Sequence, residues 1–201
     1  MSVFEKLQIT ILKALYGDPT EGELKPQISL SGGYNRWFTF KGDNTCKYCK
    51  KKNGSVFLKN ERVLSEERKE IPPVHNNCRC IILPLLAIFA ATATVDTILG
   101  VDYYLKYKGM LPDNYVDKKE AELRGWDSRK GNLRDVIKNG TMGGDPFKND
   151  KGKLPLSQER TWQEADINYS GGYRNKQRVL YFNDGLIFVT YDHYETFFEI
   201  N

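Results

Sequence analysis

The spacing of apolar and polar residues changes along the chain and predicts a different structure for each part. Residues 1–30 place apolar side chains at helical spacing up to a Gly-Asp-Pro stop, which predicts one amphipathic helix and a polar loop. Residues 32–46 have strand character, and residues 59–73 form a charged surface segment closed by two prolines. The apolar run at 80–95 is 16 residues long and holds a proline, whereas a membrane-spanning helix needs about 20 residues. We therefore expect a buried strand followed by a linker there, and no membrane span.

The second half of the chain changes from helical to strand-like spacing. Residues 96–140 predict two or three short helices, and the runs RVLYF, LIFVTYD and YETFFEI after residue 160 predict strands, the first two joined by an Asn-Asp-Gly hairpin turn. Helices followed by consecutive hairpins are typical of an α+β fold with an antiparallel sheet. We expect three parts: an N-terminal helix with a small cysteine-rich module at 1–84, a linker at 85–95, and an α+β domain at 96–201.

The bulk composition is that of a globular protein without a strong overall field. Hydrophobic residues make up 40% and aromatic residues 12% of the 201 residues, which is enough for a core. Residues 1–91 carry 14 basic and 9 acidic side chains, and the remaining 110 residues carry 16 and 17. An anion site in the second part must therefore come from a local arrangement of charges. The start of the chain lacks the uninterrupted apolar middle of a signal peptide.

Four cysteines and one histidine are concentrated in the first part. Cys46 and Cys49 form a C-x2-C pair, and His75, Cys78 and Cys80 follow in the run HNNCRC. Structural zinc sites use this spacing, and a segment of about 50 residues with few large apolar side chains needs such support to fold. Five candidates compete for four positions: we take Cys46, Cys49, His75 and Cys78 as the ligands, with Cys80 as the alternative to Cys78. Two disulfides, free thiols or a redox C-x2-C pair are the competing interpretations.

Charged residues gather in the predicted strands after residue 160. Strand alternation places Arg174, Lys176 and Arg178 on one face, and Glu164 and Asp166 share a face of the preceding strand. Cations on one face of a sheet repel one another unless an anion is bound or paired there. The pattern therefore predicts a locally built anion site.

His193 supplies a proton-transfer group for this site, because His75 is taken up by the cysteine cluster and an imidazole titrates near neutral pH. The set suits a reaction that needs no metal, the cleavage of RNA by its own 2′-hydroxyl to leave 2′,3′-cyclic phosphate ends. Glu164 would take the 2′-hydroxyl proton, His193 would protonate the leaving 5′-oxygen, and Arg174 and Arg178 would hold the phosphorane. DNA, which lacks the hydroxyl, should resist. The competing interpretation is that a lone histidine on a strand is structural.

Ten short motifs follow one another in order between residues 92 and 201: LPDNY, GW, KGNL, GGD, GKLP, RTW, EADINY, RN, LY and DHY. Together they resemble barnase and the related bacterial guanyl-preferring ribonucleases. The resemblance implies N-terminal helices packed on an antiparallel sheet whose concave face carries the site, and no cofactor for catalysis. It places Glu164 at the general base, His193 at the general acid, and Arg174 and Arg178 at the phosphate-binding arginines.

The same resemblance adds further residues to the expected site. Lys118 matches a lysine that helps to stabilise the transition state, and Asp145 matches a carboxylate that organises the basic groups. Tyr194 matches an aromatic that lines the base or product site. Trp126 and Trp162 match core tryptophans, for which we expect a structural role.

The base-recognition loop of the family corresponds to residues 147–153, FKNDKGK, and departs from the family pattern. Lys148 stands in place of a small hydroxyl residue, Asp150 in place of an arginine, and Lys151 in place of a glutamate that accepts hydrogen bonds from guanine. A lysine cannot accept a hydrogen bond. Either Asp150 serves instead, or backbone groups near Asn149 read the base, or the preference for guanine is relaxed.

The motifs WFTFKGDNTCKYC and PPVHNNCRC, within residues 31–84, resemble the cysteine-containing tail of Mu F type phage minor head proteins. Similar modules precede toxin domains, so we expect a delivered antibacterial toxin that needs no usual signal peptide, acts in the cytoplasm of a target cell, and is neutralised by an acidic inhibitor resembling barstar. One alternative is a structural or adaptor protein of a phage-like particle that carries the nuclease as a passenger. Another is that the cysteine module is a finger that binds RNA.

Overall fold

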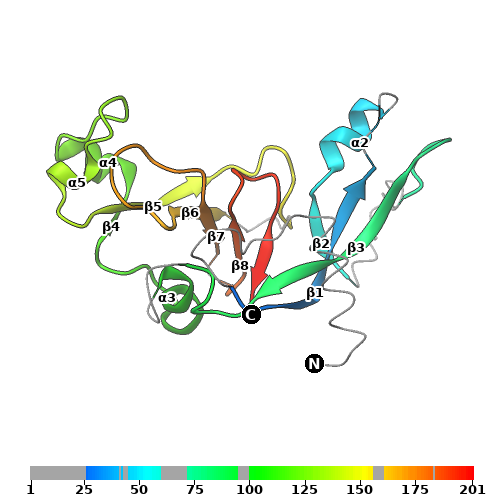
Figure 1. The fold of residues 1–201 in the computed structure, drawn as a ribbon, viewed down its shortest axis with the longest axis horizontal. Coiled ribbons are helices and arrows are strands. Elements are labelled where there is room, and N and C mark those ends of the chain that lie inside the picture. The colour runs from blue at the N-terminus through cyan, green and yellow to red at the C-terminus, as the bar shows by residue number, and fades with distance from the viewer. Residues whose placement is uncertain are drawn as a thin grey trace.

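The computed structural model describes residues 26–40, 42, 45–59, 72–94, 100–155, 161–182 and 184–201, and these residues form an α+β fold with few helices (Figure 1). The elements in chain order are β1 (Ile28–Thr39), α2 (Lys47–Lys52), β2 (Val56–Leu58), β3 (Cys80–Ile88), α3 (Val101–Lys108), β4 (Tyr115–Val116), α4 (Lys118–Leu123), α5 (Leu133–Val136), β5 (Thr141–Phe147), β6 (Trp162–Asp166), β7 (Arg178–Tyr181), β8 (Ile187–Thr190) and β9 (Phe198–Ile200).

The strands of this part of the chain form one mixed sheet in the order β2-β1-β3-β9-β8-β7-β6-β5-β4. Neighbouring strands are antiparallel except for two parallel pairs, β3 with β9 and β4 with β5. The sequence predicted an antiparallel sheet in the second part alone. The cysteine-rich part instead extends the same sheet, because β3 pairs with the C-terminal strand β9 (Figure 1).

Strand β3 extends into the segment 85–95 that we expect as a linker. Residues 85–88 are the end of this strand, and their side chains are almost completely buried. An apolar run without alternation is what a strand covered on both faces requires. Pro84 is tolerated in β3 beside an irregularity in its partner strand, where the register shifts between Leu30 and Asn35.

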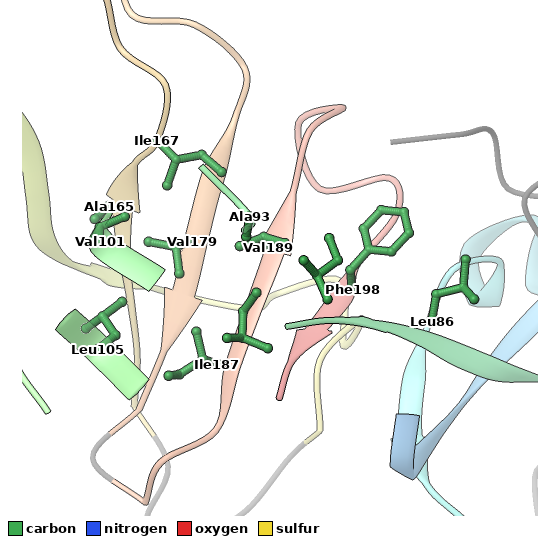
Figure 2. Packing of buried hydrophobic residues seen from close by; sticks show 12 residues of the cluster. Leu86, Ala93, Val101, Leu105, Ala165, Ile167, Val179, Ile187, Val189 and Phe198 are labelled. Atoms are coloured by element: carbon green, nitrogen blue, oxygen red, sulfur yellow. The ribbon is translucent and has the colours of Figure 1, made fainter. Parts of the chain in front are cut away.

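Helix α3 packs on one face of the sheet. Figure 2 shows Val101 and Leu105 of this helix lying over the strands that carry Val179 and Ile187. The opposite face of the sheet holds a second apolar cluster, in which Trp162 packs with side chains from β2, β7 and β8. Alternate residues of β6 point to these two faces, so that Ala165 belongs to the first cluster and Glu164 lies on the side of Trp162.

A third cluster lies under the short helices α4 and α5. It contains Trp126 and Leu133, both buried, together with Met142 of β5. The expected core role of Trp126 is therefore confirmed, and Trp162, which is 2% exposed, is a core residue as well.

Most of the elements predicted from periodicity are present. Three short helices, α3, α4 and α5, occur within 96–140, and β7, β8 and β9 fall within the three predicted strand runs, although β9 forms only at the end of the third run. The strand character expected at 32–46 corresponds to β1, which starts earlier, at Ile28, and ends earlier, at Thr39. The short strand β4 and the glycine-containing strand β5 were not predicted. The helix expected near the N-terminus and most of the charged segment at 59–73 lie outside the described residues.

Among the residues that the structure describes, no helix combines the length and the apolar character needed to cross a membrane.

Candidate active site

Glu164 lies in the middle of β6, between two other strands. It is opposite Asp145 of β5 and opposite Leu180 of β7. Its side chain is half-buried and accepts a hydrogen bond of 2.5 Å from the hydroxyl of Tyr194 to its Oε2 atom. A neighbour on each side fixes the strand, so the carboxylate is held on a rigid element.

Tyr194 connects several groups of the expected site. Its ring stacks on Phe147 with a centroid distance of 5.0 Å, and the ring of His193 lies 4.8 Å away. Burial, followed by the hydrogen bond and charge of Glu164, raises the pKa of Tyr194. The phenol therefore stays protonated at neutral pH and donates to Glu164. Tyr194 thus contacts Glu164 through its hydroxyl and its sequence neighbour His193 through its ring.

The two arginines gather around a buried carboxylate that was not assigned to the site from the sequence. Asp166 accepts two hydrogen bonds of 2.7 Å from Nε and Nη2 of Arg174, and Nε of Arg178 lies 2.9 Å from its Oδ1. Asp166 is completely buried. Burial opposes the charge of Arg174, but the hydrogen bonds and charge of Asp166 outweigh this effect and raise the pKa of that guanidinium. Asp166 is therefore the anion that holds both cations in place.

The expected strand alternation of the arginines is wrong. Strand β7 begins only at Arg178, whereas Arg174 and Lys176 belong to the loop before it. Asn175 organises this loop, because its side-chain amide donates to the carbonyl groups of Ile167 and Asn168. The two arginines converge because the loop folds back onto Asp166. Strand periodicity does not contribute to this convergence.

His193 lies in the loop between β8 and β9 and is exposed. His193 and Tyr194 both have left-handed backbone conformations, with φ of 60° and 69°, which non-glycine residues adopt only when the surroundings hold them. Asp192 provides part of this hold, since its Oδ1 accepts hydrogen bonds from the backbone N–H groups of Glu195 and Thr196 at 3.1 and 2.8 Å. Asp192 was not singled out from the sequence.

Lys118 and Asp145 meet where α4 joins the sheet. The backbone N–H of Lys118 donates to Oδ1 and Oδ2 of Asp145 at 3.2 and 3.1 Å, and the lysine side chain is exposed. Burial, followed by the charge of Asp145, raises the pKa of the neighbouring Tyr181 to about 12. Asp145 therefore fixes the start of α4 against β5 and orients the backbone of Lys118.

The loop that follows β5 is closed by one of its own side chains. Asn149 is buried and has a left-handed backbone conformation with φ of 46°. Its Oδ1 accepts from the backbone N–H groups of Lys153 and Leu154, and its Nδ2 donates to the carbonyl of Leu154 at 3.0 Å. The Asn149 side chain is thus occupied within the loop, whereas Lys148 and Asp150 are exposed.

The cysteine cluster lies at the start of α2, remote in sequence from these residues. The Sγ atoms of Cys46 and Cys49 lie 3.2 and 3.1 Å from Nε2 of His75, and Sγ of Cys49 lies 4.0 Å from that of Cys78. Zinc bonds of about 2.0 to 2.3 Å in a tetrahedron separate ligand atoms by roughly 3.5 to 3.8 Å. The observed separations lie on both sides of this range, and the ligand atoms form two groups that share Cys49, one with Cys46 and His75 and one with Cys78 and Cys80. The donor types fit a metal ion such as zinc.

The thiols of this cluster differ in their chemistry. A backbone hydrogen bond from Cys49 lowers the pKa of Cys46. Burial opposes ionisation of Cys78, but backbone hydrogen bonds near Val74 and Cys80 outweigh it and lower the pKa of Cys78 to about 7. Thiolates are the form that binds metal, so both groups are prepared as ligands. No disulfide bond joins any of these four cysteines in the structure, so the disulfide interpretation gains no support.

Comparisons with known proteins match the second part of the chain to ribonucleases. The family model described as ribonuclease matches residues 101–201. The ribonuclease of Heyndrickxia coagulans is 50% identical over 109 residues, which cover 54% of this chain and 99% of that protein. The ribonucleases of Bacillus intermedius and Bacillus pumilus are also 50% identical over 109 residues, covering 54% of this chain and 67% of each relative. The chain therefore belongs to the barnase-type ribonucleases and is an endoribonuclease.

Proposed function

We propose that the protein cleaves RNA by transesterification, without a metal in the reaction. The 2′-oxygen of the ribose attacks the adjacent phosphorus, its proton passes to the carboxylate of Glu164, and the bond from phosphorus to the 5′-oxygen breaks. The imidazolium of His193 gives its proton to that leaving oxygen. The products are a 2′,3′-cyclic phosphate end and a free 5′-hydroxyl, and general acid and base groups each contribute about 10²- to 10⁴-fold to such a step.

The observation that carries this proposal is the position of Tyr194 between the two proton-transfer groups. Its hydroxyl is 2.5 Å from Oε2 of Glu164, and its ring is 4.8 Å from that of His193. A base and an acid that act on one phosphodiester must lie within reach of its two sides. The two contacts of Tyr194 support a shared site for the base and the acid.

The arginines supply positive charge next to this place. Arg174 and Arg178 are fixed by the buried Asp166, which orients their guanidinium groups before substrate arrives. Preorganised charge stabilises the developing phosphorane at low cost in reorganisation. Lys118, held at the start of α4 by Asp145, would add a further cation to the transition state.

The loop at 147–153 would hold the base of the nucleotide before the cleaved bond. Because Asn149 is occupied by the loop itself, its side chain would shape the site, and backbone groups would read the base. Asp150 is the exposed carboxylate there and can accept hydrogen bonds from guanine, whereas Lys148 would contact phosphate. Because Lys151 stands where the family has the accepting glutamate and a lysine cannot accept a hydrogen bond, we propose a weakened preference for guanine, with Asp150 as the remaining acceptor.

One experiment tests the reaction. The purified chain is incubated with a synthetic RNA and with DNA of the same sequence, each with and without a chelator. Cleavage of RNA that survives the chelator, with intact DNA, is expected. Glu164→Gln should lower the rate by about 10²-fold or more, while Gln163→Asn, which changes the exposed neighbouring residue on the same strand, should keep it. Cleavage of the DNA would refute the proposed chemistry.

We propose that the cysteine cluster holds a structural zinc ion through Cys46, Cys49, His75 and Cys78. The hydroxyl of Thr39 favours Cys78 over Cys80. It donates to the carbonyl of Cys49 and accepts from Nε1 of Trp37, so a contact of 3.3 Å with Cys80 needs the thiol proton of Cys80 as donor. Cys80 would then donate to Thr39 instead of binding the metal.

The biological setting that we propose is that of a delivered antibacterial toxin, with residues 1–84 as the delivery module and 96–201 as the toxic domain. The resemblance of the cysteine-rich part to phage head proteins supports this setting. An endoribonuclease of this kind would act in the cytoplasm of the target cell and would require a barstar-like acidic inhibitor in the producer. To test this setting, the chain is expressed in cells with and without a co-expressed acidic protein, and growth is measured. Protection by the acidic protein would favour a toxin over a passenger domain on a phage-like particle.

A further inference from the structure

The cysteine-rich module contacts the two loops that carry the proposed base-recognition and acid groups. These contacts come from residues before position 60, outside the part that defines the family. The backbone N–H of Val56 donates to the carbonyl of Lys153 at 2.7 Å. Val56 is also buried in the same apolar cluster as Leu154 and Phe197, so the module packs against the sheet face that holds the site.

The turn before β2 fits closely against the loop of His193. Gly54 has a left-handed backbone conformation with φ of 87°, and a Cβ atom at this position would lie 2.6 Å from the carbonyl oxygen of Glu195. Its N–H donates to the carbonyl of Trp37 at 2.9 Å, which fixes the turn within the module. The module therefore touches the residue that lies two positions after His193.

Lys153 connects the two loops through a buried ammonium group. The residue is 7% exposed, and its Nζ donates to the carbonyl of Tyr194 at 3.0 Å and to Oε2 of Glu195 at 2.9 Å. Burying a charge is costly unless it is paired. These two acceptors compensate that cost, and they lie directly after His193, whose left-handed conformation needs support from its surroundings.

We propose that Lys153 is a positioning residue for the ribonuclease reaction, and that the module segment at 53–56 sets its position. Lys153 holds the peptide that follows Tyr194, and thereby holds the imidazole of His193 where it can protonate the leaving oxygen. Val56 and Gly54 keep the base-recognition loop and the histidine loop together from the module side. This inference rests on the proposed role of His193 as general acid.

The test uses two substrates that differ in their need for a general acid. One is a ribodinucleotide, whose 5′-alkoxide must be protonated as it leaves. The other is the matching nucleoside 3′-(4-nitrophenyl phosphate), whose leaving group is a stable anion at neutral pH. Both need the same base, so a defect in the position of the acid slows the first substrate far more than the second.

The variants are Lys153→Met, which keeps the length of the side chain without its charge, and Gly54→Ala, which places a methyl group against Glu195. We expect each to lower kcat on the dinucleotide by about tenfold to hundredfold and on the aryl ester by less than about threefold. Gly109→Ala is the matched control for Gly54→Ala. Gly109 has a similar φ of 70° with open space around it, and this variant should keep kcat on both substrates.

Two further variants separate the inference from the proposed function. His193→Ala should show the same selective loss on the dinucleotide, and Glu164→Gln should lose activity on both substrates. If His193→Ala loses activity equally on both, the assignment of the acid is wrong. If His193→Ala behaves as expected while Lys153→Met slows both substrates equally, or neither, Lys153 only stabilises the fold or plays no part, and the positioning role is refuted.

Discussion

Removal of the carboxylate that joins the two arginines should be strongly destabilising. The variant Asp166→Asn removes the negative charge and one of the two acceptor oxygens that Arg174 contacts at 2.7 Å and Arg178 at 2.9 Å. The side chain of Arg178 is only 7% exposed and that of Arg174 is 25% exposed. Breaking a buried ion pair by removing one partner costs about 3 to 5 kcal/mol, because the remaining charge is buried without compensation. We expect this loss in the free energy of unfolding.

Thermal unfolding followed by circular dichroism measures this change. For a chain of this size, 1 kcal/mol lowers Tm by about 2 to 4 °C, so the expected loss corresponds to a decrease of roughly 6 to 20 °C. Asp113→Asn is the control, because Asp113 is exposed and such substitutions usually change stability by about 0.5 kcal/mol or less. A loss below about 1 kcal/mol in Asp166→Asn would show that water already compensates the arginines, contrary to the burial argument.

Three more predictions address the site, the sheet and the metal cluster. Tyr194→Phe removes the hydrogen bond to Glu164. Because a hydrogen bond to a charged group contributes about 1.5 to 3 kcal/mol, kcat/KM on a ribodinucleotide should fall about tenfold to hundredfold. An unchanged kcat/KM would show that Tyr194 does not contribute to the site. Burial raises the pKa of Glu199 despite the hydroxyl of Ser31 and the nearby lysines. Protonated Glu199 therefore contributes to the free energy of unfolding at low pH. This contribution is lost as the pH rises through the raised pKa of Glu199. Glu199→Gln should then have a higher Tm than the wild type at neutral pH and the same Tm below about pH 4, and a gain that persists at low pH would contradict this. Metal analysis should find one zinc per chain in Cys80→Ser and a strongly reduced content in Cys78→Ser; the reverse result would exchange the fourth ligand.

The sequence was sufficient for the elements whose periodicity is local. The strand runs after residue 160 are rich in β-branched and aromatic residues, and the turn residues between the first two favour a hairpin, so β7, β8 and β9 could be predicted. Strand β5 could not, because TMGGDPF carries two glycines and a proline, which are usually absent from strands. Its place in the sheet comes from pairing with β6 on one side and β4 on the other.

Long-range pairing explains the other differences. The parallel pairing of Ala87 and Ile88 with Glu199 and Ile200 joins segments more than 100 residues apart, and no local pattern specifies such a pair. The run at 80–95 could therefore be predicted as a buried strand, but its membership in the C-terminal sheet could not.

The chemistry of the site was more predictable than its geometry. The need for a base and an acid pointed to Glu164 and His193 from residue types alone. The support of these groups depends on the path of the loops, because Asp166 meets Arg174 only through the fold of the loop between them. In the same way, the contact of Tyr194 with Glu164 depends on the left-handed backbone conformations of His193 and Tyr194. Strand periodicity carries no information about either contact.

Analysis of the first product by mass spectrometry tests the central claim most directly. A short synthetic RNA is cleaved to a few per cent by the wild-type chain in the presence of a chelator, and the new 3′ end is weighed. Attack by the 2′-hydroxyl predicts a 2′,3′-cyclic phosphate, and an RNA with a single 2′-deoxy nucleotide at the cleaved position should stay intact. A linear phosphate as the first product, or cleavage at the 2′-deoxy position, would contradict the mechanism, because water would then be the nucleophile.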